Sequence, residues 1–208
     1  MRRASAILSS AAAAIEFVPP NDSDPISLHD LFSTPAPLHV DLGCGDGSFL
    51  AALAEQHPER NFIGVELLLG RVRTSCRRIS RLGVTNARII RLDIARAVAF
   101  LLPPRSVDLF YLMFPDPWPK RRHHRRRVVT AEFLACIATA LKPRGALRFA
   151  SDQRDYFDHV VEVAAATGVF DAAMDDDPQL PRSTFEFRYV EAGEAIYRLE
   201  LRKISDPK

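Results

Sequence analysis

The sequence has little cysteine and no long apolar segment, and each absence argues against a class of protein. Its three cysteines, Cys44, Cys76 and Cys136, are far apart and form no CxxC pair, so neither a zinc site nor a disulfide framework is indicated. We therefore expect no metal and a reducing, cytoplasmic setting. The alanine-rich start lacks the leucines of a signal peptide, and no later stretch approaches the roughly 18 apolar residues of a membrane span.

Acidic residues are missing from one strongly basic stretch. Residues 120–127 hold six Lys and Arg and no acid, while the chain of 208 residues has a net charge of only +2, so the remainder is net −4. Such a concentration of like charge predicts a polyanionic partner such as a nucleic acid. A solvated loop is the alternative interpretation, because blocks of charge are often only exposed segments.

The chain has no internal repeat and divides into two parts. Residues 1–37 are expected to form a poorly specified N-terminal arm, and residues 38–208 one domain. Short apolar runs alternate with helical patterns from residue 38 onward, which predicts a mostly parallel α/β sheet with helices on both faces. The expected strands are residues 38–42, 61–66, 88–93, 107–114 and 146–151, and the expected helices are residues 48–56, 69–82, 130–141 and 156–167. Residues 183–190 and 195–202 are expected to form a closing antiparallel hairpin, which completes a seven-stranded sheet.

A glycine-rich turn follows the first expected strand directly. Gly43, Gly45 and Gly47 have the spacing GxGxG, which differs from the GxGxxG of dinucleotide-binding proteins. Glycine lets the backbone turn sharply and approach a ligand closely, and the next helix begins at the same edge of the sheet. A ligand site without a pyrophosphate is therefore predicted at this turn.

Three acids accompany this turn on neighbouring strands. Glu66 and Asp93 end the second and third expected strands, where carboxylates can accept hydrogen bonds from ribose hydroxyls and from an adenine amino group. Asp41, on the first strand, can face an ammonium group. Ribose, adenine and positive charge without phosphate are the features of S-adenosylmethionine, which we predict as the cofactor. The alternative is that each acid only caps a helix or is solvated.

Asp116 lies between Pro115 and Pro117, directly after the fourth expected strand. Because proline fixes φ and removes a backbone donor, the acid is presented on a stiff turn. This is the edge at which open α/β sheets bind ligands. Trp118, the only tryptophan, either stacks on a base or packs against the turn.

The run FPDPWPK at residues 114–120, with the Arg/His cluster behind it, resembles the signature of the tRNA (guanine-N7-)-methyltransferase family. The similarity covers residues 38–203 in order, including Ala150-Ser151-Asp152 and residues 184–186. It implies a Rossmann-like class I methyltransferase fold with S-adenosyl-L-methionine as cofactor. The implied reaction is methyl transfer to N7 of a guanine in tRNA, with guanine 46 of the variable loop as the target, by a monomer or homodimer.

The resemblance also implies roles for individual residues. The implied catalytic residue is Asp116. The implied cofactor-binding residues are Asp41, Gly43, Gly45, Glu66, Asp93 and Asp116. The implied substrate-binding residues are Lys120, Asp152, Ser183, Thr184, Phe185 and Glu186. The residues expected to hold the RNA are Arg122, His123, His124, Arg125, Arg126 and Arg127. One departure is that Thr184 stands where the family usually has lysine, so a contact made by that lysine is missing.

The chemistry of guanine N7 agrees with this assignment. The atom has a free lone pair and no proton, so the reaction needs alignment rather than a general base. The product base is cationic, and a fixed carboxylate such as Asp116 would stabilise the developing charge or accept hydrogen bonds from the guanine edge. Two alternatives remain: an amino-group methyltransferase, since an acid-Pro-aromatic turn also positions exocyclic amines, and a non-catalytic RNA-binding protein of the same fold.

Overall fold

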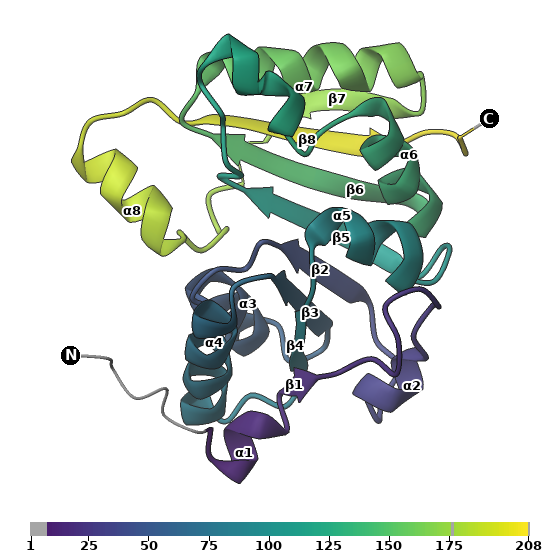
Figure 1. The fold of residues 1–208 in the computed structure, drawn as a ribbon, viewed down its shortest axis with the longest axis vertical. Helices are drawn as coiled ribbons and strands as arrows, with labels where there is room; N and C mark the ends of the chain where they lie inside the picture. The colour runs from purple at the N-terminus through teal and green to yellow at the C-terminus, as the bar shows by residue number, and fades with distance from the viewer. Residues whose placement is uncertain (1–7, 176, 208) are drawn as a thin grey trace.

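The computed structural model describes residues 8–175 and 177–207 and contains one mixed sheet of eight strands (Figure 1). The strands are β1 (Glu16–Phe17), β2 (Leu38–Leu42), β3 (Asn61–Glu66), β4 (Ala87–Arg91), β5 (Val107–Met113), β6 (Leu141–Ser151), β7 (Phe170–Met174) and β8 (Tyr197–Lys203). Their order is β1-β4-β3-β2-β5-β6-β8-β7, and only the pairs that involve β8 are antiparallel. The expected mostly parallel α/β sheet is confirmed.

Helices cover both faces of the sheet (Figure 1). Those packed on one face are α1 (Ser10–Ala13), α3 (Ser48–Gln56) and α4 (Leu69–Leu82). Those packed on the other are α2 (Leu28–Leu31), α5 (Ile94–Arg96) with the π-helix Ala97–Leu101, α6 (Ala131–Ala140) and α7 (Arg154–Thr167). Successive strand residues point to opposite faces, so that Phe62 packs under α3 and α4 while Ile63 packs in the other cluster. The α/β alternation in the sequence therefore builds two hydrophobic cores.

The predicted C-terminal hairpin is wrong in one of its two strands, because residues 183–190 do not pair with β8. Residues 183–190 form helix α8 (Thr184–Glu191), and the antiparallel neighbours of β8 are β6 and β7. The alternation of aromatic and polar residues favours a strand, but Ser183 caps the helix by accepting a hydrogen bond from the backbone N–H of Glu186 at 3.1 Å. This is a Ser-x-x-Glu capping pattern, which begins helices.

Two larger differences from the expectation remain. The strand expected to begin at residue 146 begins at Leu141, because Leu141 pairs with Val107; residues 142–145 have no partner on β5 and form an irregularity before Ala146 pairs with Leu109. The sheet has eight strands rather than seven, because β1 pairs with the outer edge of β4. That strand and helices α1 and α2 lie within the expected N-terminal arm, of which residues 1–7 are outside the described part of the chain.

Among the helices in residues 8–175 and 177–207, none has the length and apolar character needed to cross a membrane. Over the same residues, no cluster of three or more His, Cys, Asp or Glu side chains is arranged to hold a metal ion.

Candidate functional site

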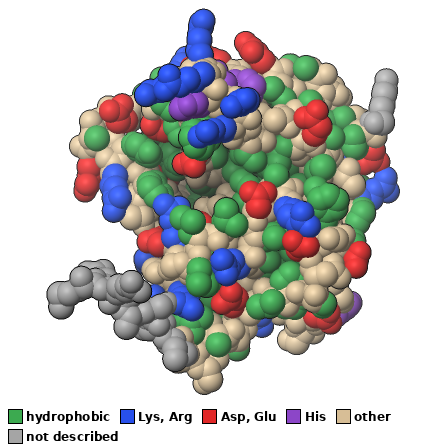
Figure 2. All heavy atoms as spheres, in the orientation of Figure 1, with side chains coloured by type: hydrophobic (Ala, Val, Ile, Leu, Met, Phe, Trp, Pro, Cys, Tyr) green, Lys and Arg blue, Asp and Glu red, His purple; other side chains and the backbone are tan. Residues whose placement is uncertain are grey.

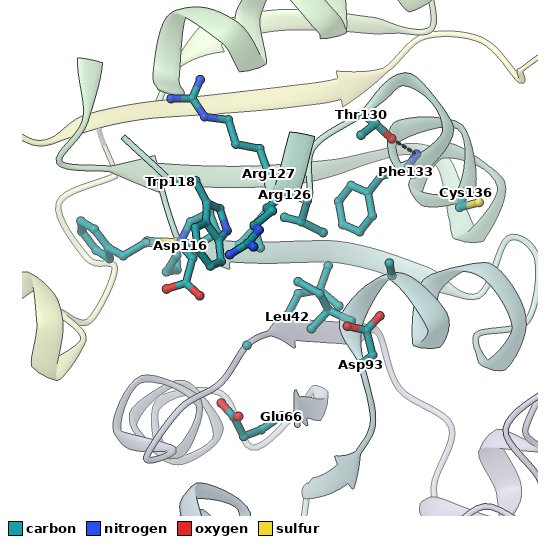
Figure 3. Close-up of a pocket in the computed structure, with 18 of the residues that line it drawn as sticks. Leu42, Glu66, Asp93, Asp116, Trp118, Arg126, Arg127, Thr130, Phe133 and Cys136 are labelled. Carbon is teal, nitrogen blue, oxygen red and sulfur yellow. Dashed lines mark hydrogen bonds between the residues drawn. The ribbon is translucent and has the colours of Figure 1, made fainter. Parts of the chain in front are cut away.

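Two adjoining pockets open at the carboxyl ends of the central strands. The large pocket, of about 670 Å³, extends from Glu66 and Asp93 to Trp118. The small pocket, of about 180 Å³, is lined by Asp41 and by the start of α8. The turn Phe114–Asp116 lines both of them. Figure 3 shows Asp116 and Trp118 on one side of the large pocket and Glu66 and Asp93 on the other. The acids predicted at separate strand ends therefore share one site.

The glycine-rich turn fixes the orientation of Glu66. Gly45 donates its backbone N–H to one oxygen of the Glu66 carboxylate at 3.1 Å, and Leu68 donates to the other at 2.8 Å. Gly47 has φ +73°, and a Cβ there would lie 2.7 Å from the Cβ of Ser75, so only glycine lets α3 approach α4 this closely. The N–H groups of Gly45 and Leu68 thus hold the Glu66 carboxylate before any ligand binds.

Asp41 is a buried acid beside Glu66. Its side chain is 3% exposed and lines the small pocket. Burial, together with the charge of Glu66, raises the pKa of Asp41 to about 7. A cationic group placed in this pocket would favour the ionised form, so the carboxylate suits an ammonium or sulfonium ligand.

Asp93 has two roles in the structure. One oxygen of its carboxylate accepts the backbone N–H of Arg96 at 3.1 Å and caps α5, which is the alternative considered from sequence. The same residue also lines the large pocket beside Ile94 and Ala95. Capping therefore does not remove Asp93 from the site.

The turn that carries Asp116 is strained and held from several sides. Phe114 and Trp118 have φ of +56° and +44°, a left-handed backbone that costs non-glycine residues of order 1–3 kcal/mol each. Phe114 is anchored by its N–H, which donates to Ala150 at 2.8 Å. Arg127 donates from Nε to the carbonyl of Pro117 at 3.0 Å. The exposed carboxylate of Asp116 is thereby fixed where the two pockets meet.

The basic segment divides into exposed residues and one buried arginine. Arg127 is 4% exposed, and its guanidinium pairs with Asp155 and lies 4.7 Å from the ring centroid of Tyr156. It is therefore turned into the protein, apart from the other side chains expected to hold RNA. The exposed cations are Lys120, Arg121, Arg122, Arg125 and Arg126.

These exposed cations surround a half-buried aromatic residue. They belong to a 3₁₀ helix, Arg121–Arg126, and the Lys that precedes it, and Figure 2 shows Lys, Arg and His side chains gathered above the hollow of the site. The Arg126 guanidinium lies 4.8 Å from the Trp118 ring centroid, and the His123 ring meets it edge-on at 5.9 Å. The structure places Trp118 both against this helix and on the pocket wall. The remaining His124 lies 3.7 Å from Asp155.

Helix α8 brings three of its four predicted substrate residues to the small pocket, together with Asp152. The Thr184 hydroxyl lies 2.9 Å from that of Ser48 at the start of α3. Glu186 instead is 3% exposed and pairs with Arg198 and Arg182, so it anchors the helix to β8. Lys120 lines neither pocket and lies with the exposed basic residues.

The sequence did not point to Tyr189 or Arg71 as site residues. Tyr189 lines the small pocket and stacks near Phe114 with ring centroids 5.4 Å apart. Burial, followed by the charges of Asp152 and Asp116, raises the pKa of Tyr189. Arg71 lines both pockets and lies 3.9 Å from Glu66. The one available signal for Tyr189 is its helical spacing four residues after Phe185, which appears only once α8 is recognised as a helix.

Comparison with known proteins gives consistent matches. A family model described as "Putative methyltransferase" matches residues 35–201. The tRNA (guanine-N(7)-)-methyltransferase of Leifsonia xyli is 39% identical over 188 residues, which cover 86% of this chain and 82% of that protein. The protein of the same name from Cutibacterium acnes is 35% identical over 188 residues, covering 87% of this chain and 68% of the relative.

Solved structures agree on the fold. An rRNA methylase from Streptococcus thermophilus superposes with a TM-score of 0.57 at 17% sequence identity, covering 86% of this chain and 92% of that one. This match confirms the expected class I methyltransferase fold. The family model spans most of the chain, and both relatives exceed 30% identity over more than two thirds of their length. The chain therefore belongs to the tRNA (guanine-N(7)-)-methyltransferase family.

Proposed function

We propose that this chain transfers the methyl group of S-adenosyl-L-methionine to N7 of a guanine in tRNA, with guanine 46 of the variable loop as the target. One observation supports this proposal most strongly. Asp116 is an exposed carboxylate on a strained turn that neighbouring residues hold in place. It lies where two pockets meet: the large one, lined by Glu66 and Asp93, and the small one, lined by aromatic and polar side chains. One side suits a nucleoside cofactor and the other a purine base.

The residues of the two pockets fit the cofactor. Glu66 is held with both oxygens at the pocket edge and would bind the ribose hydroxyls, and Asp93 would bind the adenine amino group. Asp41 would face the methionyl ammonium, and its raised pKa supports a cationic neighbour. A Cβ built on Gly43 meets nothing within 4 Å, so the backbone there leaves open space beside the ligand. When bound, S-adenosylmethionine supplies an electrophilic methyl group.

The small pocket provides what the guanine requires. Because N7 has a lone pair and no proton, the protein has only to align the base and to favour the positive charge that develops on it. Asp116 would supply that favourable charge from a fixed position. Phe114 and Tyr189, which stack on each other, offer an apolar wall for the base, and Asp152 offers a further acceptor.

The exposed basic residues would hold the tRNA backbone. Lys120 and residues 121–126 lie directly beside the turn of Asp116, so a bound backbone would bring the base to the carboxylate. Arg127 has a different role in this proposal. Because it is buried and bonded to the carbonyl of Pro117, it positions the turn and does not touch RNA.

The proposal is tested by mass analysis of nucleosides from an unmodified tRNA transcript incubated with the protein and S-adenosylmethionine. The expected product is 7-methylguanosine. Formation of N6-methyladenosine instead would show an amino-group methyltransferase. If neither nucleoside forms and equilibrium dialysis detects no S-adenosylmethionine binding with or without tRNA, the non-catalytic RNA-binding alternative is correct.

A further inference from the structure

Helix α4 carries a second concentration of positive charge, part of which lies outside the proposed site. Five of its residues are arginine and none is acidic; they are Arg71, Arg73, Arg77, Arg78 and Arg81. Together with residues 120–127 they account for eleven positive charges, so the rest of a chain with net charge +2 is net −9. An uncompensated basic helix on an acidic protein indicates a polyanionic partner.

The five arginines are not equivalent. Arg78 pairs with Asp46 at 3.0 Å and Arg71 lies 3.9 Å from Glu66, so both belong to the cofactor turn. For Arg73, Arg77 and Arg81, no carboxylate oxygen of the described residues lies within 4.0 Å. These three are spaced by four residues and therefore form one stripe, in which successive side chains are about 6 Å apart along the helix. We call it the α4 stripe.

A groove lies along this stripe. It has a volume of about 370 Å³, lies where α1 meets α4 and is lined by Arg77 and Arg81 together with Ala12 and the hydroxyl side chains of Ser9, Thr74 and Ser80. Guanidinium forks bind phosphate oxygens, and hydroxyls can add donors, although that of Thr74 already donates to the Gly70 carbonyl at 2.9 Å. The lining includes no acid. The groove therefore suits the sugar-phosphate backbone of a nucleic acid.

The position of the stripe relates it to the site. Helix α4 begins three residues after Glu66, at the edge of the site, and its 14 residues carry it about 20 Å away. The basic residues 121–126 lie beside Asp116 on the other side of the large pocket. Figure 2 shows Lys and Arg side chains on both sides of the hollow. A ligand that contacts both regions must therefore extend across the large pocket and along α4.

We propose that the α4 stripe is a second contact for the tRNA backbone, and that it binds a part of the tRNA outside the variable loop that bears the target guanine. The inference rests on the proposed function and adds a surface to it. It explains why α4 keeps three arginines without acidic partners on its outer side. Because the contact is to phosphate, it contributes affinity and salt dependence but no base specificity.

The test compares two double variants that remove the same charge. Arg77→Gln with Arg81→Gln removes two of the three charges of the stripe, those that line the groove, and introduces residues of high helix propensity. In the control, Arg105→Gln with Arg202→Gln, the two lost cations are 62% and 54% exposed and pair with Asp206 and Glu200. Binding is measured with full-length tRNA and with a short tRNA fragment made of the variable loop and the two stems that flank it, over a range of salt concentrations. Thermal unfolding checks that each variant is folded.

We expect the stripe variant to bind full-length tRNA about tenfold more weakly, with the slope of log affinity against log salt reduced by about two. We expect the control to match the wild type, and the stripe variant to bind the short tRNA fragment as the wild type does. Wild-type affinity and slope of the stripe variant for full-length tRNA would overturn the inference alone. Absence of 7-methylguanosine with the wild-type protein would overturn the proposed function, and the inference with it.

Discussion

The two sides of the site are built in different ways. On the proposed cofactor side, residues 41–93, the acids lie at or near the ends of adjacent strands, and the backbone N–H groups of Gly45, in the glycine-rich turn, and of Leu68, after β3, hold Glu66. On the substrate side, residues 114–127 with α8, the position of Asp116 depends on side chains from distant parts of the chain. Arg127 is the clearest of these, since it connects the turn to α7.

This difference indicates where each side is vulnerable. A backbone-held site depends on chain conformation, so changes at glycine should act on it mainly through stability. A site held by side chains should lose the alignment of its catalytic group when one of these side-chain contacts is removed, even if the protein stays folded. Four predictions probe this contrast, from the largest expected effect to the smallest.

The largest effect is expected at the centre of the substrate side. Asp116→Asn keeps the shape of the side chain and removes its charge, so we expect the methyl-transfer rate to fall on the order of 10²–10³-fold. Retention of tRNA on a filter should remain close to that of the wild type. Near-normal single-turnover methyl transfer by this variant would show that Asp116 does not stabilise the developing charge.

The second effect separates the buried arginine from the exposed ones. Arg127→Lys keeps the charge but cannot bond both Pro117 and Asp155 in the same geometry, so we expect the rate to fall about tenfold to a hundredfold. The salt dependence of tRNA binding should not change. In contrast, Arg125→Ala with Arg126→Ala should weaken tRNA binding and flatten its salt dependence. A flattened salt dependence for Arg127→Lys would mean that Arg127 contacts the RNA.

The third prediction is that the affinity for S-adenosylmethionine depends on pH. Because the pKa of Asp41 is raised to about 7, the group is protonated below that pH and cannot attract an ammonium. We expect the Kd for S-adenosylmethionine, measured by calorimetry from pH 8 to pH 5.5, to rise by up to about tenfold per pH unit below 7. The free energy of unfolding of the free protein should show the opposite trend. Because folding raises the pKa of Asp41, protonation of this group stabilises the folded protein increasingly as the pH falls from 7 towards the ordinary pKa of an aspartate.

The variant Asp41→Asn provides the control for both trends. It has no proton to gain in this range, so the pH dependence of binding and the contribution to stability should both disappear. If the wild type and Asp41→Asn show the same pH profile, then another group controls cofactor binding.

The smallest effect is on stability alone. Gly47→Ala and Gly83→Ala both place alanine in the left-handed region, at φ +73° and +70°, which costs about 1–2 kcal/mol. Only at Gly47 does the new Cβ also meet Ser75, at 2.7 Å, so we expect a further loss of about 1–3 kcal/mol. Urea unfolding measures the difference. Equal losses would show that α3 and α4 are not packed this closely.

Much of the cofactor side was predictable because its signals are local. Asp41 lies within β2, Glu66 ends β3 and Asp93 follows β4 by two residues, and parallel strands must bring their carboxyl ends to one edge. The stiff turn around Asp116 followed in the same way from the two prolines. The family resemblance added the identity of the substrate, which spacing alone does not specify.

The substrate side was less predictable because its contacts are tertiary. In sequence, Arg127 is one of six cations, and only its burial against Asp155 and Tyr156 distinguishes it. The residues of α8 alternate like a strand, and the helix is stabilised by the Ser183 cap and by the pairing of Glu186 with Arg198 on β8. Local patterns do not reveal such partners.

The central claim is that Asp116 at the junction of the two pockets directs methylation to guanine N7. The most direct measurement is chain cleavage at 7-methylguanosine in an unmodified tRNA transcript, after parallel incubation with the wild type and with Asp116→Asn. We predict one cleavage, at guanine 46 of the variable loop, with the wild type and almost none with the variant. No cleavage with the wild type, or equal cleavage with both proteins, would contradict the account.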